Sequence, residues 1–483
     1  MAHKTLNLSK IKYKNLGFFR FKKMDNNYLL TNEVGDYLFL KPDDFKNFLE
    51  GRLDKRKKTY RKLKEKNFIK SHSATERLIE KYSQKNCFLA QGPSLHIVIP
   101  TLRCDHKCVY CQASSRPENA KNSDMDVETA EKVLEIIFSS PSKYIAVEFQ
   151  GGEPLLNWKI VKFIINRSIE KAKQNQKDLQ LRLVSNFSQM DDEKLNFLFN
   201  KKVNVCTSLD GPEKLHNKNR IYPKGNSYKI VTKYLKKAMK LFREREKSGY
   251  LTMPGALVTL TKESLKYPKQ IVDEYLKWGF EQIYFRPTTR LGMAGKVWQR
   301  IGYSPEDYLQ FYRRALNYII EINKKGKFFY EQSTLIFLHK IFSERDPGAL
   351  DWRSPCGAGI GQMVYNYNGK VYSCDEGRMV SEMGDESFLL GNVKKDRYRD
   401  LLNNKVVKTL VTASCLDNNV CDLCAYKPYC GVCPVRNYAE LGDLFPPMSY
   451  NDRCKINRGI LDFIFNKLEN KQTKKILMNW LKR

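Results

Sequence analysis

The sequence contains no long apolar segment. No run of eighteen or more consecutive apolar residues occurs in its 483 residues, and about that length is needed for a transmembrane helix. The N-terminal segment MAHKTLNLSKIKYK also lacks the apolar stretch of a secretory signal. Internal repeats and low-complexity tracts are absent as well. We therefore expect a cytoplasmic protein without a membrane partner.

Acidic residues are scarce relative to basic ones. The chain has 53 Asp and Glu against 85 Lys and Arg, which gives a formal net charge of +32. A surface this basic favours anionic partners, such as nucleic acid, an acidic protein or an acidic peptide. Lysine is spread along the whole chain, however, so a generally lysine-rich protein explains the charge as well as a dedicated polyanion site does.

Residues 1–90 differ in pattern from the rest of the chain. Short apolar runs with turn residues between them are typical of a small antiparallel meander. Pro42-Asp43-Asp44 then opens a helix, and a basic helix follows near residues 55–66. The content predicts a small N-terminal α+β domain that is winged-helix-like. The apolar runs of this meander are 18–21, 28–31 and 37–40.

Residues 91–330 alternate short apolar runs with longer helical segments. Six such β–α units in sequence imply a parallel sheet with right-handed crossovers. Because a closed barrel has eight units, we expect an α/β fold built on a partial, open (β/α)6 TIM-like barrel, with its chemistry at the C-terminal ends of the strands. The six predicted strands are 95–99, 144–149, 179–184, 203–208, 256–260 and 282–285.

Beyond residue 330 this alternation fades. We expect a bridging region over 331–355 and a domain over 356–454 that is rich in Cys, Gly, Pro and Asn. A region of that composition needs a crosslink for stability, and its cysteines suggest that bound metal provides it. Residues 455–483 show the periodicity of one or two amphipathic C-terminal helices.

Ten of the thirteen cysteines fall into two groups, while Cys87 and Cys206 fit ordinary buried thiols. The first group is Cys104, Cys108 and Cys111, directly after the first predicted barrel strand. Three thiolates on one loop can hold three irons of a [4Fe–4S] cluster and leave the fourth iron open. The alternative is a zinc site with His106 as fourth ligand, although His106 has little room to reach the same ion.

This loop resembles that of the radical S-adenosylmethionine (SAM) superfamily, whose motif is CxxxCx(aromatic)C. Tyr110 fills the aromatic position, which lies against the adenine in that family. Gln150, Gly151, Gly152 and Glu153 end the second predicted strand, where the family has its GGE motif. Glycines let the backbone approach a ligand, and a carboxylate and carbonyls can accept from an amino group.

Polar residues also end the third and fourth predicted strands. The resemblance implies that Ser185, Asn186 and Ser208 contact the ribose and carboxylate of SAM, and a plain polar cap at a strand end is the alternative for each. His216 and Arg220 resemble the family's HDxxR pattern with Asn in place of the Asp, which leaves their role open.

Seven further cysteines resemble the SPASM extension of peptide-modifying radical SAM enzymes. One departure is that two residues separate Cys430 from Cys433, where many relatives have three. The resemblance implies two auxiliary [4Fe–4S] clusters, three clusters in all, and two zinc knuckles are the alternative. One auxiliary cluster would use Cys356, Cys374 and Cys433, and the other Cys421, Cys424, Cys430 and Cys454.

Two positions near these cysteines have open roles. Three ligands leave the first auxiliary cluster one short, and Cys415, an exogenous ligand or the substrate could complete it. Asp375 directly follows Cys374. In the sulfatase-maturing relatives the Asp at this position deprotonates the substrate, so the resemblance implies a catalytic base here. An exposed loop aspartate is the alternative.

The N-terminal stretch FFRF…YLLTNEVGDYLFL…DDF…FLEGRL and the Cys111-Gln112 pair resemble the HxsB group, the His-Xaa-Ser system radical SAM maturases, and the resemblance extends over residues 1–483. The resemblance implies an oxidoreductase in which a 5′-deoxyadenosyl radical abstracts hydrogen from a ribosomally made peptide or protein. The product would be a crosslink, a thioether, an oxidised residue or an epimer. Implied partners are the precursor peptide, a reductant such as flavodoxin or ferredoxin, and a second radical SAM protein.

Two further roles follow from this resemblance and from the charge. The N-terminal domain would bind an extended leader peptide by adding it as a strand to a sheet edge. Alternatively, it would cap the barrel or bind a partner. Radical SAM modification of RNA is the alternative activity that the charge favours. RNA readers commonly stack bases on aromatic side chains, and the basic helix near residues 55–66 shows no such stripe.

Overall fold

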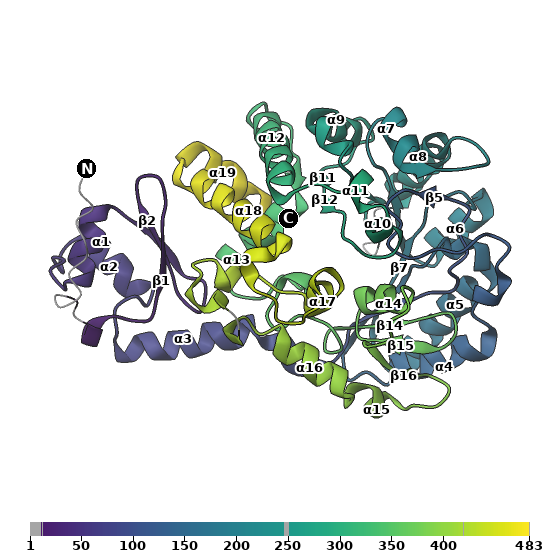
Figure 1. Cartoon of the computed structure of the whole chain (residues 1–483), viewed down its shortest axis with the longest axis horizontal. Coiled ribbons are helices and arrows are strands. Elements are labelled where there is room, and N and C mark those ends of the chain that lie inside the picture. The colour runs from purple at the N-terminus through teal and green to yellow at the C-terminus, as the bar shows by residue number, and fades with distance from the viewer. Residues whose placement is uncertain (1–10, 12, 246–250, 419, 483) are drawn as a thin grey trace.

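The computed structural model describes residue 11 and residues 13–245, 251–418 and 420–482. The N-terminal segment on which we based the absence of a secretory signal therefore lies mostly outside the described residues. Figure 1 shows a small N-terminal module at one end, the parallel sheet with its helices at the other, and the cysteine-rich region with the C-terminal helices between them. No described helix combines the length and the apolar character that crossing a membrane demands.

The predicted partial barrel is confirmed. Six parallel strands lie in the order β12-β10-β8-β7-β6-β4. Apolar side chains of these strands and of the covering helices form the two largest clusters of the core. The strands are β4 (Leu95–Val98), β6 (Tyr144–Phe149), β7 (Asp178–Val184), β8 (Val203–Ser208), β10 (Gly255–Leu260) and β12 (Phe285–Pro287).

The helices follow the strands as the periodicity predicts. Asp126 and Asp191 cap the first turns of α4 and α6 through their side chains. α9 begins at Pro268, after a short 3₁₀ turn. The helices of this region are α4 (Val127–Phe138), α5 (Trp158–Gln174), α6 (Asp192–Asn200), α7 (Glu213–Asn219), α8 (Ser227–Arg245), α9 (Pro268–Lys277), α10 (Met293–Lys296), α11 (Trp298–Ile301), α12 (Pro305–Lys324) and α13 (Gln332–Phe342).

The barrel sheet does not stop where the alternation of the sequence fades. β14 (Gln362–Tyr365) pairs parallel with β4, and the hairpin of β15 (Lys370–Tyr372) and β16 (Leu389–Asn392) extends the same sheet antiparallel. The cysteine-rich region is thus joined to the barrel by backbone hydrogen bonds. Its helices are α14 (Asp375–Ser381), α15 (Tyr398–Leu402), α16 (Lys405–Ala413) and α17 (Pro434–Leu441).

The predicted strand over residues 282–285 divides in two. β11 (Gln282–Ile283) pairs with β13 (Tyr330–Glu331) in a separate small sheet, and only β12 joins the barrel. The prediction that Cys87 is a buried thiol is wrong, because Cys87 is exposed at the end of a helix. A lone cysteine carries no periodic signal that would have revealed its exposure.

The N-terminal module is an antiparallel meander followed by three helices. Its small core is made of leucine and phenylalanine side chains, among them Leu30, Phe45 and Phe68. The first strand begins two residues later than the sequence suggested. The elements are β1 (Arg20–Lys23), β2 (Tyr28–Thr31), β3 (Tyr37–Leu40), α1 (Pro42–Leu49), α2 (Lys58–Glu65) and α3 (His72–Lys85).

This module packs on the cysteine-rich region and on α18 (Asp452–Glu469), which is followed by the last helix, α19 (Lys471–Trp480). Tyr429 donates its hydroxyl to the Gly35 carbonyl at 2.9 Å, and the rings of Tyr37 and Phe465 meet edge to face with centroids 5.4 Å apart. Segments from the two ends of the chain therefore share one interface (Figure 1).

Candidate active site

Cys104, Cys108 and Cys111, the loop cysteines, lie on the loop that follows β4. β5 (Lys107–Cys108) pairs with β9 (Arg220–Ile221), which fixes the middle of this loop. All three side chains line one cavity of about 910 Å³ at the carboxyl ends of the barrel strands. Burial raises the pKa of the Cys108 thiol to about 12. A bound iron ion would favour the deprotonated thiol, because its positive charge would offset the cost of burying a thiolate.

The glycine turn after β6 packs directly on this loop. The Gly152 amide donates to the Thr101 carbonyl at 3.1 Å, and the Glu153 amide donates to the Arg103 carbonyl at 2.7 Å. A Cβ atom on Gly152 would lie 2.1 Å from the Arg103 carbonyl oxygen. Gly151 has a φ of 134°, which a side chain would strain. Gly151 and Gly152 therefore let the turn after β6 approach the backbone of the loop that carries the loop cysteines.

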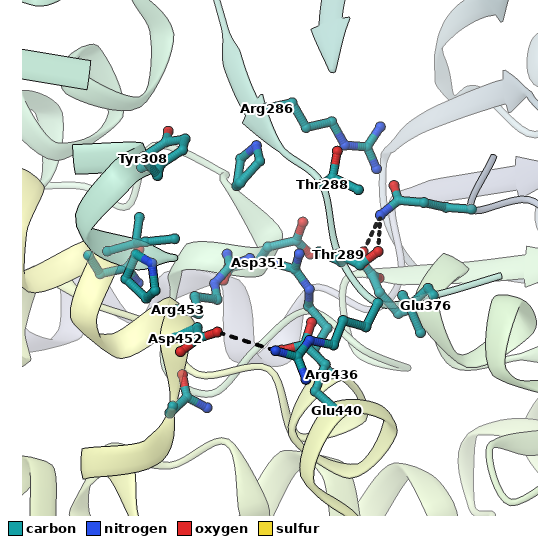
Figure 2. A pocket seen from close by; sticks show the side chains of 18 of the residues that line it. Arg286, Thr288, Thr289, Tyr308, Asp351, Glu376, Arg436, Glu440, Asp452 and Arg453 are labelled. Atoms are coloured by element: carbon teal, nitrogen blue, oxygen red, sulfur yellow. Dashed lines mark hydrogen bonds and ion pairs between the residues drawn. The ribbon is translucent and has the colours of Figure 1, made fainter. Parts of the chain in front are cut away.

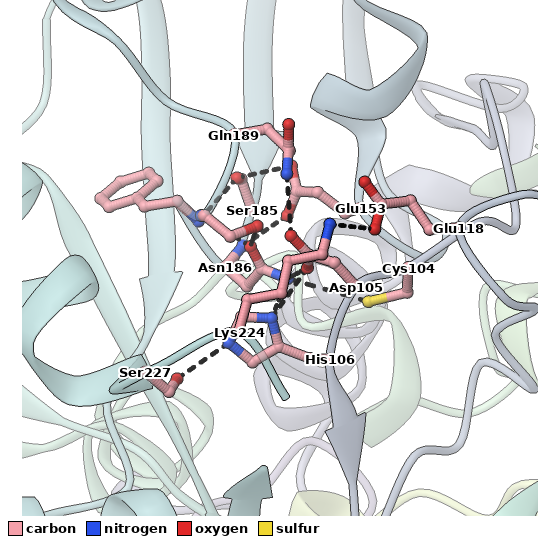
Figure 3. A network of polar contacts seen from close by, with 12 residues as sticks. Cys104, Asp105, His106, Glu118, Glu153, Ser185, Asn186, Gln189, Lys224 and Ser227 are labelled. Carbon is pink, nitrogen blue, oxygen red and sulfur yellow. Dashed lines mark hydrogen bonds and ion pairs between the residues drawn. The ribbon is translucent and has the colours of Figure 1, made fainter. Parts of the chain in front are cut away.

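Glu153 organises the neighbouring strand end rather than lining the cavity. Its buried carboxylate accepts from the Ser185 hydroxyl and from the Asn186 backbone amide, each at 2.8 Å (Figure 3). It also accepts from the Leu155 backbone amide at 3.0 Å. Burial raises the pKa of Glu153 to about 7. The cavity itself is lined by the other predicted SAM contacts, namely Tyr110, Gln150, Gly151, Gly152, Ser185, Asn186 and Ser208.

Two residues that sequence reasoning left without a role hold Tyr110 in place. The Tyr110 hydroxyl donates to Asp210 at 2.7 Å, and Arg220 donates to the same hydroxyl oxygen at 2.8 Å. All three side chains are buried, and Arg220 also lines the cavity. The buried carboxylate of Asp210 and the guanidinium of Arg220 compensate each other in charge. The HDxxR-like pattern was the one sequence signal that pointed to Arg220.

His106 is engaged on both ring nitrogens. Nδ1 lies 2.8 Å from Asp105 Oδ1, and Nε2 lies 2.9 Å from the Ser227 hydroxyl (Figure 3). The ring also stacks on Tyr222, with centroids 4.7 Å apart. Ligation of zinc by His106 would break one of these contacts, so the geometry favours three cysteine ligands alone. Three thiols around one cavity fit an iron–sulfur cluster with an open iron.

The seven cysteines of the second group gather in two places. The inner auxiliary cysteines are Cys356, Cys374 and Cys433, which are buried in one apolar cluster. The outer auxiliary cysteines are Cys421, Cys424, Cys430 and Cys454, which line a cavity of about 1460 Å³ beside β1. Burial, together with the charge of the neighbouring cysteines, raises the pKa of the Cys421 thiol to about 12. Two clustered thiol sets of this kind suit two iron–sulfur clusters.

Cys415 and Asp375 have partners of their own. The Cys415 thiol lies 3.3 Å from the Val411 carbonyl, to which it donates. Asp375 accepts from Arg378 Nε at 2.8 Å and lines the cavity of the loop cysteines. Asp375 is thus placed next to the predicted SAM site, held by a buried guanidinium.

A second cavity of about 1050 Å³, the inner cavity, adjoins the first. Gln112, Arg286 and Met379 line both cavities. Charged side chains of both signs converge on the inner cavity from β12, α14, α17 and α18, and the labelled ones include Arg286, Glu376 and Arg436 (Figure 2). The inner cavity is partly open to solvent, and its charged walls suit a polar group next to the predicted SAM site.

Two family descriptions match this chain. Residues 98–258 match the Radical SAM superfamily, and residues 356–434 match the SPASM iron–sulfur cluster-binding domain. The chain therefore carries a radical SAM domain followed by a SPASM domain. These two regions contain all of the loop cysteines and six of the seven auxiliary cysteines, since Cys454 lies beyond the second match.

Characterised proteins share this arrangement. The chain is 22% identical to a cysteine-type anaerobic sulfatase-maturating enzyme of Clostridium perfringens (strain 13 / Type A), over 76% of this chain and 95% of that protein. The fold resembles native anSMEcpe with bound AdoMet, with a TM-score of 0.64, 18% identity and coverage of 79% of this chain and 99% of that one. Streptococcus suis SuiB bound to S-adenosylmethionine gives a TM-score of 0.51 at 15% identity, with coverage of 90% and 98%.

Proposed function

We propose that this protein is a radical SAM oxidoreductase that modifies a ribosomally made peptide or protein. The observation that carries this proposal is the shared wall between the cavity of the loop cysteines and the inner cavity. A radical formed in the first cavity would face a substrate held in the second across this shared wall. Solved relatives support a peptide as substrate: SuiB has been solved with its precursor peptide SuiA, and anSMEcpe with the Cp18Cys peptide.

The cofactors supply the difficult chemistry. When bound, SAM at a reduced [4Fe–4S] cluster supplies a 5′-deoxyadenosyl radical that abstracts a hydrogen atom. Tyr110, held by Asp210 and Arg220, would support the adenine. Ser185, Asn186 and Ser208 would bind the polar groups of SAM from the strand ends.

We propose three [4Fe–4S] clusters in total. The inner and outer auxiliary cysteines would hold two of them, with the fourth ligand of the inner cluster supplied from outside the cysteine set. Asp375 would take up a proton from the substrate, because it lies at the cavity and its carboxylate is oriented by Arg378. The auxiliary clusters would carry away an electron from the product.

The N-terminal module would recognise the peptide. β1 and β3 are the edge strands of its sheet, and an extended peptide can pair with such an edge. The module packs beside the outer auxiliary cysteines, so a peptide held there would start close to the cysteine-rich region. Membership of the His-Xaa-Ser system maturases would add a second radical SAM protein as partner, and flavodoxin or ferredoxin would serve as reductant.

Co-expression with small open reading frames from the same gene neighbourhood tests this function. Mass spectrometry of the recovered peptides should show a loss of hydrogens, a gain of mass, or an epimerisation visible after deuterium labelling. A variant with Cys104→Ala in the same strain provides the matched negative control. If no peptide is changed while the protein forms a salt-sensitive RNA complex, the RNA-modifying alternative becomes the better account.

A further inference from the structure

A third cavity lies where three parts of the fold meet. It has a volume of about 660 Å³ and we call it the junction cavity. Its walls come from the end of α3, from the loop after α13, and from the chain around the outer auxiliary cysteines. It is separate from the SAM site and from the inner cavity, with which it shares none of the residues that line it.

Four cationic side chains that line the junction cavity, those of Lys85, Lys340, Arg345 and Arg353, form no ion pair among the described residues. Lys85 donates to the Lys340 carbonyl at 3.0 Å, and Lys340 donates to the carbonyls of Trp352 and Cys430. The Arg353 guanidinium stacks on the Phe88 ring, with its central carbon 3.9 Å from the ring centroid. Arg353 is only 5% exposed and its Nε has no hydrogen-bond partner.

Two of the three acidic residues that line the junction cavity are already in ion pairs. Lys427 forms ion pairs with both Glu33 and Asp417. The remaining acid, Asp346, accepts from the Gly348 amide at 2.8 Å and is in no ion pair among the described residues. Asp346 is therefore the one acid outside an ion pair that faces Lys85, Lys340, Arg345 and Arg353, which leaves a surplus of positive charge in this partly open cavity.

We propose that the junction cavity binds an oxyanion, and that this oxyanion is the carboxylate of an acidic side chain in the peptide substrate. The peptide as its source rests on the proposed function, whereas the anion site itself does not. A carboxylate would pair with Lys85 and Arg353 through charge-assisted hydrogen bonds, and Arg353 Nε is the donor that lacks an acceptor.

The physical chemistry of the cavity supports this assignment. Burying cations without an anion is costly, and burial lowers the pKa of Lys85 to about 8, with Lys340 acting in the same direction. A bound carboxylate would reverse that penalty. The position also suits a peptide, because α3 belongs to the N-terminal module while Cys430 on the opposite wall belongs to the outer auxiliary cysteines. An acidic residue here would anchor the peptide across the interface.

Calorimetric titration of the anaerobically reconstituted full-length enzyme tests the proposal. The probes are a blocked tetraglutamate peptide, its tetraglutamine counterpart and inorganic phosphate, at about 0.15 M salt so that long-range attraction to the basic surface is screened. We expect the tetraglutamate peptide to bind and the tetraglutamine peptide not to bind. Lys85→Met should weaken binding roughly tenfold or more, as the loss of one charge-assisted contact does.

Lys81→Met is the matched control, since it removes a lysine one turn earlier on α3 that pairs with Asp36 instead of lining the cavity. Its affinity should equal that of the wild type. Arg353→Gln provides a second variant from another wall, and circular dichroism and thermal melting verify that each variant is folded. Equal weakening by Lys81→Met and Lys85→Met, or no binding of any probe, would overturn the anion site.

Binding of phosphate without binding of the tetraglutamate peptide would overturn the peptide carboxylate as the source and leave a free-anion site. The proposed function stands or fails independently of this titration. It depends on SAM cleavage and on peptide mass, neither of which the calorimeter measures. An enzyme that modifies a peptide yet fails every titration refutes the junction site alone.

Discussion

The loop cysteines and the inner auxiliary cysteines differ in what the fold places around them. The loop cysteines line a cavity with polar walls, and Asn186 lies 3.7 Å from the Cys104 sulfur as a hydrogen-bond donor. The inner auxiliary cysteines are buried among apolar side chains such as Leu291 and Phe388. A cluster in the first setting can exchange a ligand, whereas a cluster in the second is shielded and suits electron transfer.

The difference also extends to how each set is assembled. The loop cysteines fall within eight consecutive residues, so local turns suffice to bring them together. The inner auxiliary cysteines span residues 356–433 and meet only because β14 joins the barrel sheet and α14 and α17 pack on each other. Substitution of a loop cysteine should therefore reduce SAM cleavage itself. Substitution of an inner auxiliary cysteine should instead reduce peptide modification and disturb the local packing.

Cys104→Ala should have the largest effect. Loss of one of three iron ligands removes the SAM-binding cluster, so SAM cleavage should fall by more than about 1000-fold. The auxiliary clusters should remain, and with them about two-thirds of the iron expected for three [4Fe–4S] clusters. Measurement of 5′-deoxyadenosine and of bound iron checks both points. The exposed Cys87 provides a matched control, because Cys87→Ala should change neither value; full SAM cleavage by Cys104→Ala would refute the radical SAM site.

Cys374→Ala should separate the two centres. It removes an inner auxiliary ligand, so peptide modification should fall by about 100-fold while SAM cleavage changes by less than about threefold. Product and 5′-deoxyadenosine are measured in the same reaction. Cys415→Ala is the control, since the Cys415 thiol contacts Val411 and should be dispensable. If Cys415→Ala removes iron to the same extent, then Cys415 is the missing fourth ligand.

Gly152→Ala should damage the first centre without touching a ligand. The new methyl group would overlap the Arg103 carbonyl, and displacement of the cluster loop by about 1 Å should slow SAM cleavage roughly tenfold to 100-fold. Gly255→Ala is the matched control, because its nearest neighbour is the Cys206 sulfur at 3.2 Å, on a side chain that can move. Equal rates for the two variants would show that the glycine turn does not position the loop.

Glu153→Gln should produce the smallest effect, visible in the pH dependence of stability. The pKa of Glu153 is about 7 in the folded chain against an ordinary value of 4.5, so the folded state binds the proton more tightly. That contribution is complete below pH 4.5 and is lost as the pH rises through 7. The free energy of unfolding of the wild type, relative to Glu153→Gln, should fall by roughly 1–3 kcal/mol between pH 5 and pH 8. Anaerobic urea titrations measure it, and a difference independent of pH would contradict the buried, titrating carboxyl.

Much of the site could be predicted from the sequence. The spacing of the loop cysteines and the strand-end positions of Gly151, Ser185 and Ser208 place them at one edge of a parallel sheet, and the structure brings them to one cavity. Asp210 and the support of Tyr110 could not be predicted, because a single buried polar contact has no periodic signature. The same holds for Glu153, whose partners lie on a neighbouring strand end.

The sequence by itself determined the barrel and the number and spacing of the thiols, because hydrophobic periodicity and short-range ligand geometry are local properties. Only the tertiary structure decided that the cysteine-rich region continues the barrel sheet through β14 and that the inner cavity adjoins the cavity of the loop cysteines. It alone placed Lys85, Lys340, Arg345 and Arg353 around the junction cavity. Those features depend on contacts between residues far apart in the chain, which only the packing of the whole core specifies.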